Sequence, residues 1–150
     1  MKNFLITLFT VLFVFSCGSL KSSLKTVDST VIGPQLNEAF GSFIITKKAT
    51  SKKYGYDPDY PVNVNFTSVE DGYNNQMRFL NGLAGPKGEK ISYTLKESCC
   101  PFPTKKTETG AGTIDIFEIT WPGQTKPIIL YINKFEKGEL LIPLGFSIRN

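Results

Sequence analysis

The feature that most constrains this chain is an apolar run at its N-terminus. Lys2 is followed by the run from Phe4 to Phe15 (FLITLFTVLFVF), in which only Thr7 and Thr10 are polar. A short positive region followed by an apolar stretch of this length is typical of a secretory signal peptide. A membrane-spanning helix needs about 20 apolar residues. We therefore expect this segment to direct export and not to remain as a membrane span.

The run ends in Val14-Phe15-Ser16-Cys17, and this ending resembles the signal of bacterial lipoproteins. In that signal an aliphatic residue and small residues precede a cysteine, and Val14, Ser16 and Cys17 match it. The resemblance implies cleavage after Ser16 and attachment of diacylglycerol, with acyl groups such as palmitate, to Cys17. Several acyl chains hold a protein stably at a membrane. Gly18 is not the aspartate of an inner-membrane retention signal. The expected location is thus the outer membrane with the domain in the periplasm. The alternatives are a cell-surface orientation and a soluble secreted protein.

Export divides the 150 residues into three parts. Residues 1–16 form the signal peptide. Residues 17–37 hold the acylated cysteine and a stretch rich in Ser, Thr and Lys, which we expect to be a flexible tether. Residues 38–150 are enough for one globular domain with a core of ordinary size. Loss of Lys2 lowers the formal net charge from +4 to +3, and an exported chain is not expected to meet nucleic acid.

The chain contains no histidine, which removes the commonest general base and the commonest metal ligand. Ser-His-Asp triads, Cys-His pairs, HExxH zinc sites and haem held by a proximal histidine are therefore excluded. We expect no catalytic residue, no metal and no cofactor. These expectations favour a binding or structural module over an enzyme.

Strand patterns outnumber helix patterns in the expected domain. They show apolar–polar alternation, β-branched and aromatic composition, or a continuous apolar run. The segments are residues 43–46, 62–66, 91–96, 114–121 and 127–135. The five-residue link 122–126 contains glycine and predicts an antiparallel hairpin between the last two. The continuous apolar run 127–135 indicates an internal, buried strand. Pro61 limits residues 62–66 to a strand start or an edge.

One helix is expected between Asp71, a possible cap, and the stop signal Gly85-Pro86. Apolar residues at the spacing of one helical face define its expected buried side. They are Tyr73, Met77, Leu80 and Ala84. The expected fold class is therefore α+β, with a small antiparallel sheet of four to five strands and one helix packed on a face.

The most unusual stretch is Cys99-Cys100-Pro101-Phe102-Pro103, which together with Ser98 we expect to be a loop. If Cys17 carries lipid, only Cys99 and Cys100 remain available for a disulfide, and these two residues are direct neighbours in the sequence. Cα atoms joined by a disulfide usually lie about 4.4–6.8 Å apart, whereas neighbouring Cα atoms lie about 3.8 Å apart. A Cys99–Cys100 disulfide would therefore be strained and easily reduced, and would fit a redox or ligand-contact role. Buried thiols, a vicinal disulfide, and metal or intermolecular pairing stay open.

Aromatic and acidic side chains form a second candidate site. They are Tyr54, Tyr56, Asp57, Asp59 and Tyr60, together with Phe102. Tyrosine rings can stack on sugars or contact peptides, and paired carboxylates can bind calcium or act as acid and base. The alternative is that the rings fill the core and that Asp57-Pro58-Asp59 is a turn with solvated carboxylates.

Six segments outside the signal peptide carry a more specific pattern. They are Tyr54-Gly55-Tyr56, residues 77–93 (MRFLNGLAGPKGEKISY), residues 98–102 (SCCPF), residues 126–133 (KPIILYIN), residues 137–140 (KGEL) and residues 143–146 (PLGF). Together they resemble a family of small Gram-negative lipoproteins of uncharacterised function. Members of that family are often labelled 2-dehydro-3-deoxyphosphooctonate aldolase. That enzyme is a TIM barrel, a fold of typically about 250 residues, and its sugar-phosphate substrates are cytoplasmic. We therefore do not expect aldolase activity.

The expected function is that of a lipid-anchored envelope protein. Lipidated Cys17 would attach it to the membrane, and its domain would bind an envelope protein, glycan or lipid. The alternative is a thiol-redox factor or an enzyme that uses Cys99 and Cys100.

Overall fold

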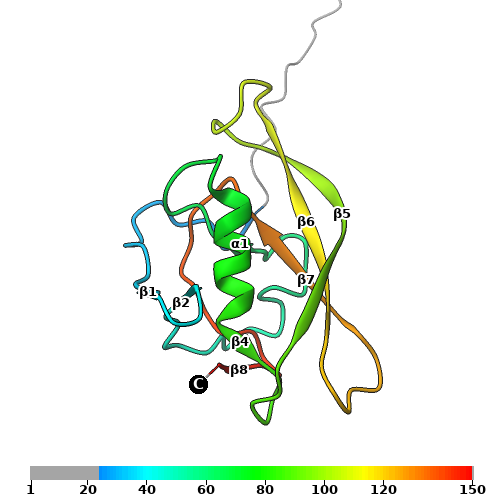
Figure 1. Cartoon of the computed structure of the whole chain (residues 1–150). Coiled ribbons are helices and arrows are strands. Elements are labelled where there is room, and N and C mark those ends of the chain that lie inside the picture. The colour runs from blue at the N-terminus through cyan, green and yellow to red at the C-terminus, as the bar shows by residue number, and fades with distance from the viewer. Residues whose placement is uncertain (1–23, 150) are drawn as a thin grey trace, which may run out of the picture.

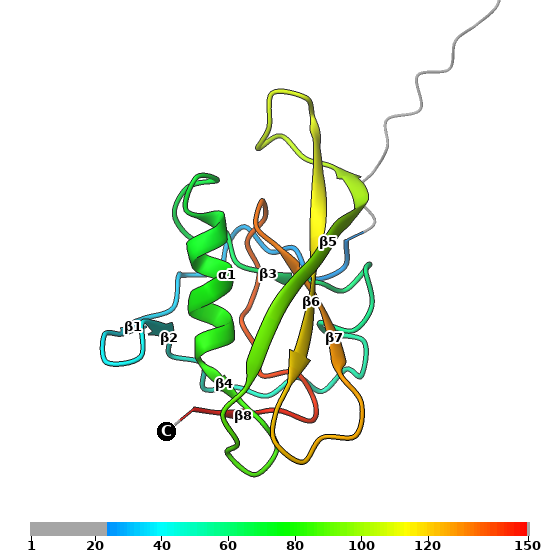
Figure 2. The ribbon, with the colours of Figure 1, turned by 45° about the vertical axis from the view of Figure 1, so that its right-hand side comes forward.

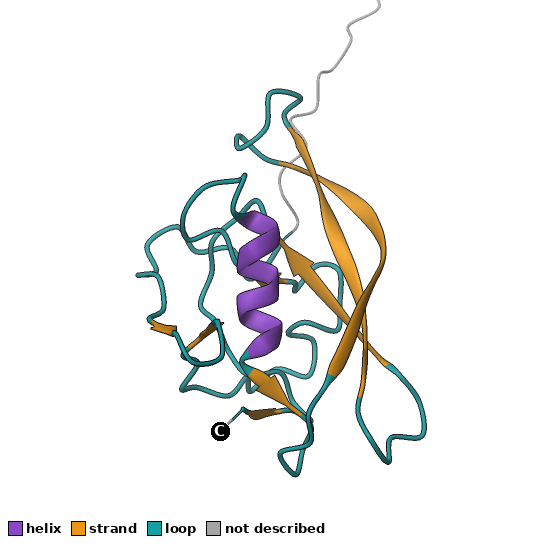
Figure 3. Ribbon diagram, in the orientation of Figure 1, coloured by secondary structure: helices purple, strands orange, loops and turns teal. Residues whose placement is uncertain are grey.

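The computed structural model describes residues 24–149, so the predicted signal peptide and Cys17 lie outside the described residues. Figures 1 and 3 show one helix beside a strongly twisted sheet. The elements in chain order are β1 (Leu36–Asn37), β2 (Ser42–Phe43), β3 (Val62–Asn63), α1 (Gly72–Asn81), β4 (Leu83–Ala84), β5 (Ser92–Pro103), β6 (Ala111–Thr120), β7 (Ile128–Asn133) and β8 (Ser147–Ile148). The expected α+β class, with one helix and mostly strands, is confirmed.

The main sheet has four strands in the order β3-β7-β6-β5. The predicted β6–β7 hairpin is confirmed, because the two strands pair antiparallel with Phe117 opposite Leu130. β7 is internal and β3 is an edge strand, as the apolar run and Pro61 predict. The sheet differs from the expectation in one respect: β3 pairs parallel with β7, so the sheet is mixed. A parallel pair needs a long crossover, and residues 64–127 supply one that includes α1, β5 and β6.

Helix α1 packs on one face of the sheet (Figure 2), and its buried side agrees in part with the one that apolar periodicity predicts. Its buried residues are Gly72, Asn75, Gln76, Phe79 and Leu80, whereas Tyr73 is 55% exposed. The helix ends at Asn81, with Gly82 as its C-cap, and Ala84 belongs to β4. Leu80 and Ala84 are nevertheless buried and Met77 packs against the core, as predicted. The prediction is wrong for Tyr73, because the amides of Asn75 and Gln76 occupy the buried side of the first turns.

The core lies between α1 and the sheet. Aromatic and aliphatic side chains from both layers are fully buried there: Val62, Phe79, Leu80, Leu83, Phe117, Ile119, Leu130 and Ile132. Burying one such side chain contributes roughly 1.5–3 kcal/mol. This packing fixes the orientation of β5 and β6, the two strands that carry the candidate site.

The described part of the expected tether, residues 24–37, contacts the domain. The Lys25 amide donates to the Asp59 carbonyl oxygen at 2.7 Å, and residues 36–37 form β1. The Thr26 hydroxyl accepts a hydrogen bond of 2.9 Å from the buried side-chain amide of Asn63. A Ser/Thr-rich composition indicates a tether, but here a threonine supplies the partner that a buried amide needs. Residues 24–37 therefore lie against the rest of the described domain.

Candidate functional site

Cys99 and Cys100 are joined by a vicinal disulfide. Both residues are half-buried and lie within β5, not in the expected loop. The register with β6 shifts between Cys99 and Phe102, which marks a bulge. Cys100 has a φ of 56°, the only positive φ of a residue other than glycine among residues 24–149. The strand therefore turns sharply at the disulfide and continues to Pro103.

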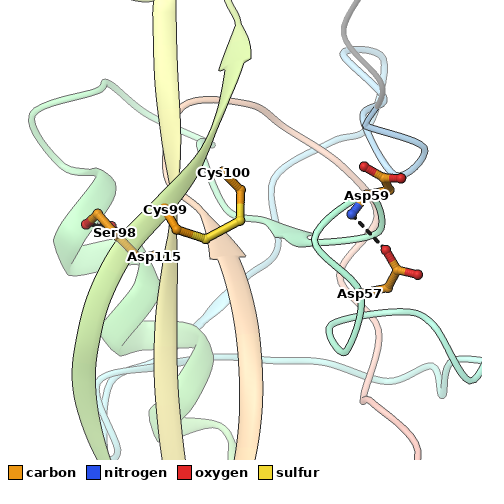
Figure 4. The surroundings of a disulfide bond; sticks show 6 residues. All are labelled: Asp57, Asp59, Ser98, Cys99, Cys100 and Asp115. Carbon is orange, nitrogen blue, oxygen red and sulfur yellow. Dashed lines mark hydrogen bonds between the residues drawn. A yellow bond between two sulfur atoms is a disulfide. The ribbon is translucent and has the colours of Figure 1, made fainter.

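The disulfide and Ser98 lie on opposite faces of the sheet. Ser98 is opposite Asp115 in the register and Cys99 is opposite Ile114, and side chains alternate between the two faces of a strand. Figure 4 shows Ser98 and Asp115 together on the side of α1, with the disulfide on the other side of β5. The two groups thus form separate sites that share one strand.

Asp115 is the centre of a buried polar cluster that the sequence analysis did not identify. Its carboxylate is 1% exposed and accepts hydrogen bonds from Gln76 Nε2 at 2.8 Å and from Lys134 Nζ at 2.9 Å. The Ser98 hydroxyl donates to the other carboxylate oxygen. Gln76 Oε1 is buried without a partner among the described residues. The cluster joins α1, β5 and β6 to Lys134, which directly follows β7.

A signal for this cluster exists in the sequence. Asp115 interrupts the apolar run of β6, and residues 115 and 118 have opposite parity, which predicts opposite faces. The structure agrees: Glu118 lies away from Asp115 and pairs with Lys96 at 3.5 Å, where both side chains are partly exposed. A buried carboxylate needs a cation and hydrogen-bond donors, but the spacing alone does not name Lys134 or Gln76 as these partners.

The tyrosines of the second candidate site have structural partners. Tyr54 is buried, and its hydroxyl donates to the Glu139 carbonyl oxygen at 3.0 Å and accepts from the Leu141 amide at 3.1 Å. Burial raises the pKa of Tyr54. The Tyr56 hydroxyl donates to the Leu144 carbonyl oxygen, and burial raises the pKa of Tyr56 to about 12. These rings join the loop 54–60 to the C-terminal segment.

The remaining residues of that site contact one another or Lys53 within residues 53–60, except Phe102, which lies in β5. The Asp57 carboxylate accepts from the Asp59 amide at 2.9 Å and lies 3.6 Å from Lys53 Nζ, which is the geometry of a turn (Figure 4). The Lys53 ammonium also lies 5.0 Å from the centre of the Tyr60 ring. Phe102 is buried and packs edge-on against Phe135 with ring centres 6.2 Å apart.

Two further findings concern residues 24–149 as a whole. This part of the chain holds no group of three or more Cys, Asp or Glu side chains arranged to bind a metal ion. It also contains no helix that is long and apolar enough to cross a membrane.

Comparisons with known proteins found no match for this chain among protein-family models, curated proteins or solved structures. The functional argument therefore depends on the residues of the site itself.

Proposed function

We propose that this chain is an exported domain that is anchored to the outer membrane through lipid on Cys17, faces the periplasm and binds an envelope partner. The observation that carries this proposal is the disulfide between Cys99 and Cys100. The sequence has three cysteines, so Cys17 is the cysteine that remains for acylation. Disulfides persist in oxidising compartments and are rare in the cytosol. The disulfide thus supports export, and the cysteine count supports the anchor.

The docked segment from residue 24 onward limits how far the domain can lie from its anchor. Seven residues, 17–23, connect the proposed lipid to Leu24. Even a fully extended chain spans at most about 3.6 Å per residue. This limit places Leu24 within about 25 Å of Cys17, close enough for contact with lipid, glycan or another membrane protein.

The proposed contact surface is the face of β5 that carries the disulfide. Cys99 and Cys100 are half-buried and Pro101 is exposed, so a partner can reach the turn at this position. A residue other than glycine in the left-handed region costs roughly 1–2 kcal/mol. Such conformations cluster at ligand-contact and active sites. The backbone at Cys100 therefore supports a functional role for this turn.

The position of β5 at the edge of the sheet also affects how a partner can bind. β5 is an edge strand of the main sheet as far as residues 24–149 show. Its register with β6 shifts near Lys96 and again after Cys99. Bulges and an edge lysine oppose continuous pairing with another strand. We therefore propose contact through side chains at the disulfide and not addition of a further strand.

The anchor is tested by membrane fractionation of the full chain in a Gram-negative host. The unaltered chain should sediment with outer membranes, and Cys17→Ser should move the domain to the soluble fraction. The matched control is the double variant Cys99→Ser/Cys100→Ser, which keeps Cys17 and should stay with the membranes. A Cys17→Ser chain that still sediments with membranes refutes the anchor.

The contact surface is tested by chemical crosslinking in intact cells followed by purification of the chain. The double variant Cys99→Ser/Cys100→Ser should lose the crosslinked partner. A matched variant at the other candidate site, Asp57→Asn/Asp59→Asn, should keep it. If both double variants retain the same partner, the disulfide is not the contact surface.

A thiol-redox function is the second candidate, and the accessibility of the vicinal disulfide favours it. A thiolate of a dithiol reductant would attack one cysteine sulfur and form a mixed disulfide. The reductant's second thiolate would then close its own disulfide and release Cys99 and Cys100 as thiols. Turnover in an insulin-reduction assay that disappears in Cys99→Ser/Cys100→Ser would support this function. Absence of turnover would support binding.

A further inference from the structure

Figure 1 shows the β1–β2 hairpin, β4 and β8 near one end of α1. Residues of these elements line two hollows that share Arg149. The larger hollow has a volume of about 370 Å³, and its walls are mainly apolar. The apolar walls come from Phe40, Phe43, Ile44, Ile45 and Ile148. Small-molecule sites commonly have volumes of about 300–1,000 Å³, so this hollow is large enough for a small apolar group.

The smaller hollow, of about 170 Å³, is polar and cationic. Lys90, Asn81 and Tyr93 contribute to its walls, and Arg149 lines both hollows. Arg149 therefore lies at the junction of the apolar and the cationic space.

The fold holds the two cations in place. The Arg149 amide donates to the Gly82 carbonyl oxygen at 2.9 Å, and its guanidinium lies 4.6 Å from the centre of the Phe40 ring. Lys90 forms a β-bridge with Ala84, which pairs with Ser147 of β8. These backbone contacts thus fix the Cα positions of Arg149 and Lys90 beside β4.

Neither cation has an acidic partner among residues 24–149. The ion pairs in this part of the chain involve Lys47, Lys53, Lys96 and Lys134, and none involves Lys90 or Arg149. Two cations without an acidic partner among residues 24–149, both beside one small hollow, attract an anion. Arginine in particular matches the planar geometry of carboxylate and phosphate oxygens.

Two of the apolar side chains around the larger hollow are open to solvent. Ile44 is 44% exposed and Ile148 is 41% exposed. Exposed apolar groups that gather beside a hollow mark interaction sites more often than isolated ones do. An apolar chain placed there would cover these side chains and would end next to Arg149.

We propose that the two hollows together bind an anionic amphiphile: a single apolar chain in the larger hollow, with its carboxylate or phosphate group at Arg149 and Lys90. The apolar walls recognise the chain, and Arg149 and Lys90 recognise the anionic group. This site is separate from the disulfide and does not depend on the function proposed above.

The test is calorimetric titration of the full chain carrying Cys17→Ser, in detergent-free buffer, with dodecyl phosphate below its micelle concentration. Dodecyl maltoside, which has a neutral head group, and inorganic phosphate, which has no chain, are the comparison ligands. Dodecyl phosphate should bind at one site, and each comparison ligand should bind at least about tenfold more weakly. Equal binding of dodecyl maltoside, or of inorganic phosphate, would overturn the proposal.

Variants locate the site. Arg149→Gln should weaken dodecyl phosphate binding at least about tenfold, which corresponds to the loss of one charge-assisted contact. Lys126→Gln is the matched control, because Lys126 is exposed in the β6–β7 link and lines neither hollow. Arg149→Lys keeps the charge but not the planar guanidinium, so its binding should fall between that of the unaltered chain and that of Arg149→Gln. This partial rescue separates a lost contact from a folding defect. Unchanged binding in Arg149→Gln would overturn the proposal.

Discussion

The buried cluster around Asp115 allows a direct test of what holds the helix and the sheet together. Asp115→Asn keeps the size of the side chain but removes its charge and turns one acceptor atom into a donor. Gln76 Nε2 and Lys134 Nζ, at 2.8 Å and 2.9 Å from the carboxylate, then face a weaker or a repulsive partner. Gln76 is fully buried, so its lost hydrogen bond is not replaced by water.

The expected decrease in the free energy of unfolding follows from these contacts. Breaking a buried ion pair from one side costs about 3–5 kcal/mol. The Lys134 side chain is 28% exposed, so its ammonium can regain water and the cost falls toward the lower end. We therefore expect Asp115→Asn to lower the free energy of unfolding by about 3 kcal/mol.

The assay is urea-induced unfolding followed by circular dichroism without reductant, so that the disulfide stays intact. The matched control is Glu118→Gln on the same strand, which removes an equal charge from an exposed pair with Lys96. Exposed pairs contribute about 0–1 kcal/mol. The double variant Asp115→Asn/Lys134→Met should be more stable than Asp115→Asn, because it removes the stranded ammonium. A loss below about 1 kcal/mol in Asp115→Asn, equal to that of the control, would refute the role of this cluster.

Three further results are expected. Phe79→Ala should lower the free energy of unfolding by about 3–5 kcal/mol, because Phe79 is fully buried. Tyr73 is exposed, so Tyr73→Ala should change this free energy by less than about 1 kcal/mol. Equal losses in the two variants would contradict the observed helix face. Burial raises the pKa of Tyr56 from 10.0 to about 12, so the folded chain keeps a proton that the unfolded chain releases, and stability declines between pH 10 and 12. Tyr56→Phe should make the decline of the urea midpoint in this window less steep, and an unchanged slope would contradict this cause. Finally, the purified chain should release no phosphate from phosphoenolpyruvate and arabinose 5-phosphate at enzymatic rates, and measurable turnover would contradict a binding function.

Periodicity predicted where the helix and the long strands lie, but it failed where polar groups are buried. Tyr73 fits an apolar stripe, yet Asn75 and Gln76 occupy the buried side because their amides find distant partners. Asn75 Nδ2 donates to Thr67 Oγ1 at 3.2 Å, and Gln76 Nε2 donates to Asp115. A pattern of hydrophobicity cannot show that a polar side chain will meet such a partner.

The sequence pattern also failed to predict the length of β5 and the direction in which β3 pairs. A loop was expected at the two cysteines, but β5 continues through them to Pro103. Among residues 24–149 β5 is an edge strand, where proline is tolerated. β3 has only two residues, and nothing in them encodes parallel pairing with β7. The binding hollows depend on the β4–β8 pair, which brings Arg149 beside Gly82 from the other end of the domain. Such contacts arise from the fold as a whole.

The central claim, an exported domain with lipid on Cys17, is tested most directly by the intact mass of the chain extracted from outer membranes. The account predicts the mass of residues 17–150 increased by diacylglycerol and an N-terminal acyl group, with the two hydrogens of the Cys99–Cys100 disulfide missing. The unmodified mass of residues 1–150, or a processed chain without lipid, would contradict it.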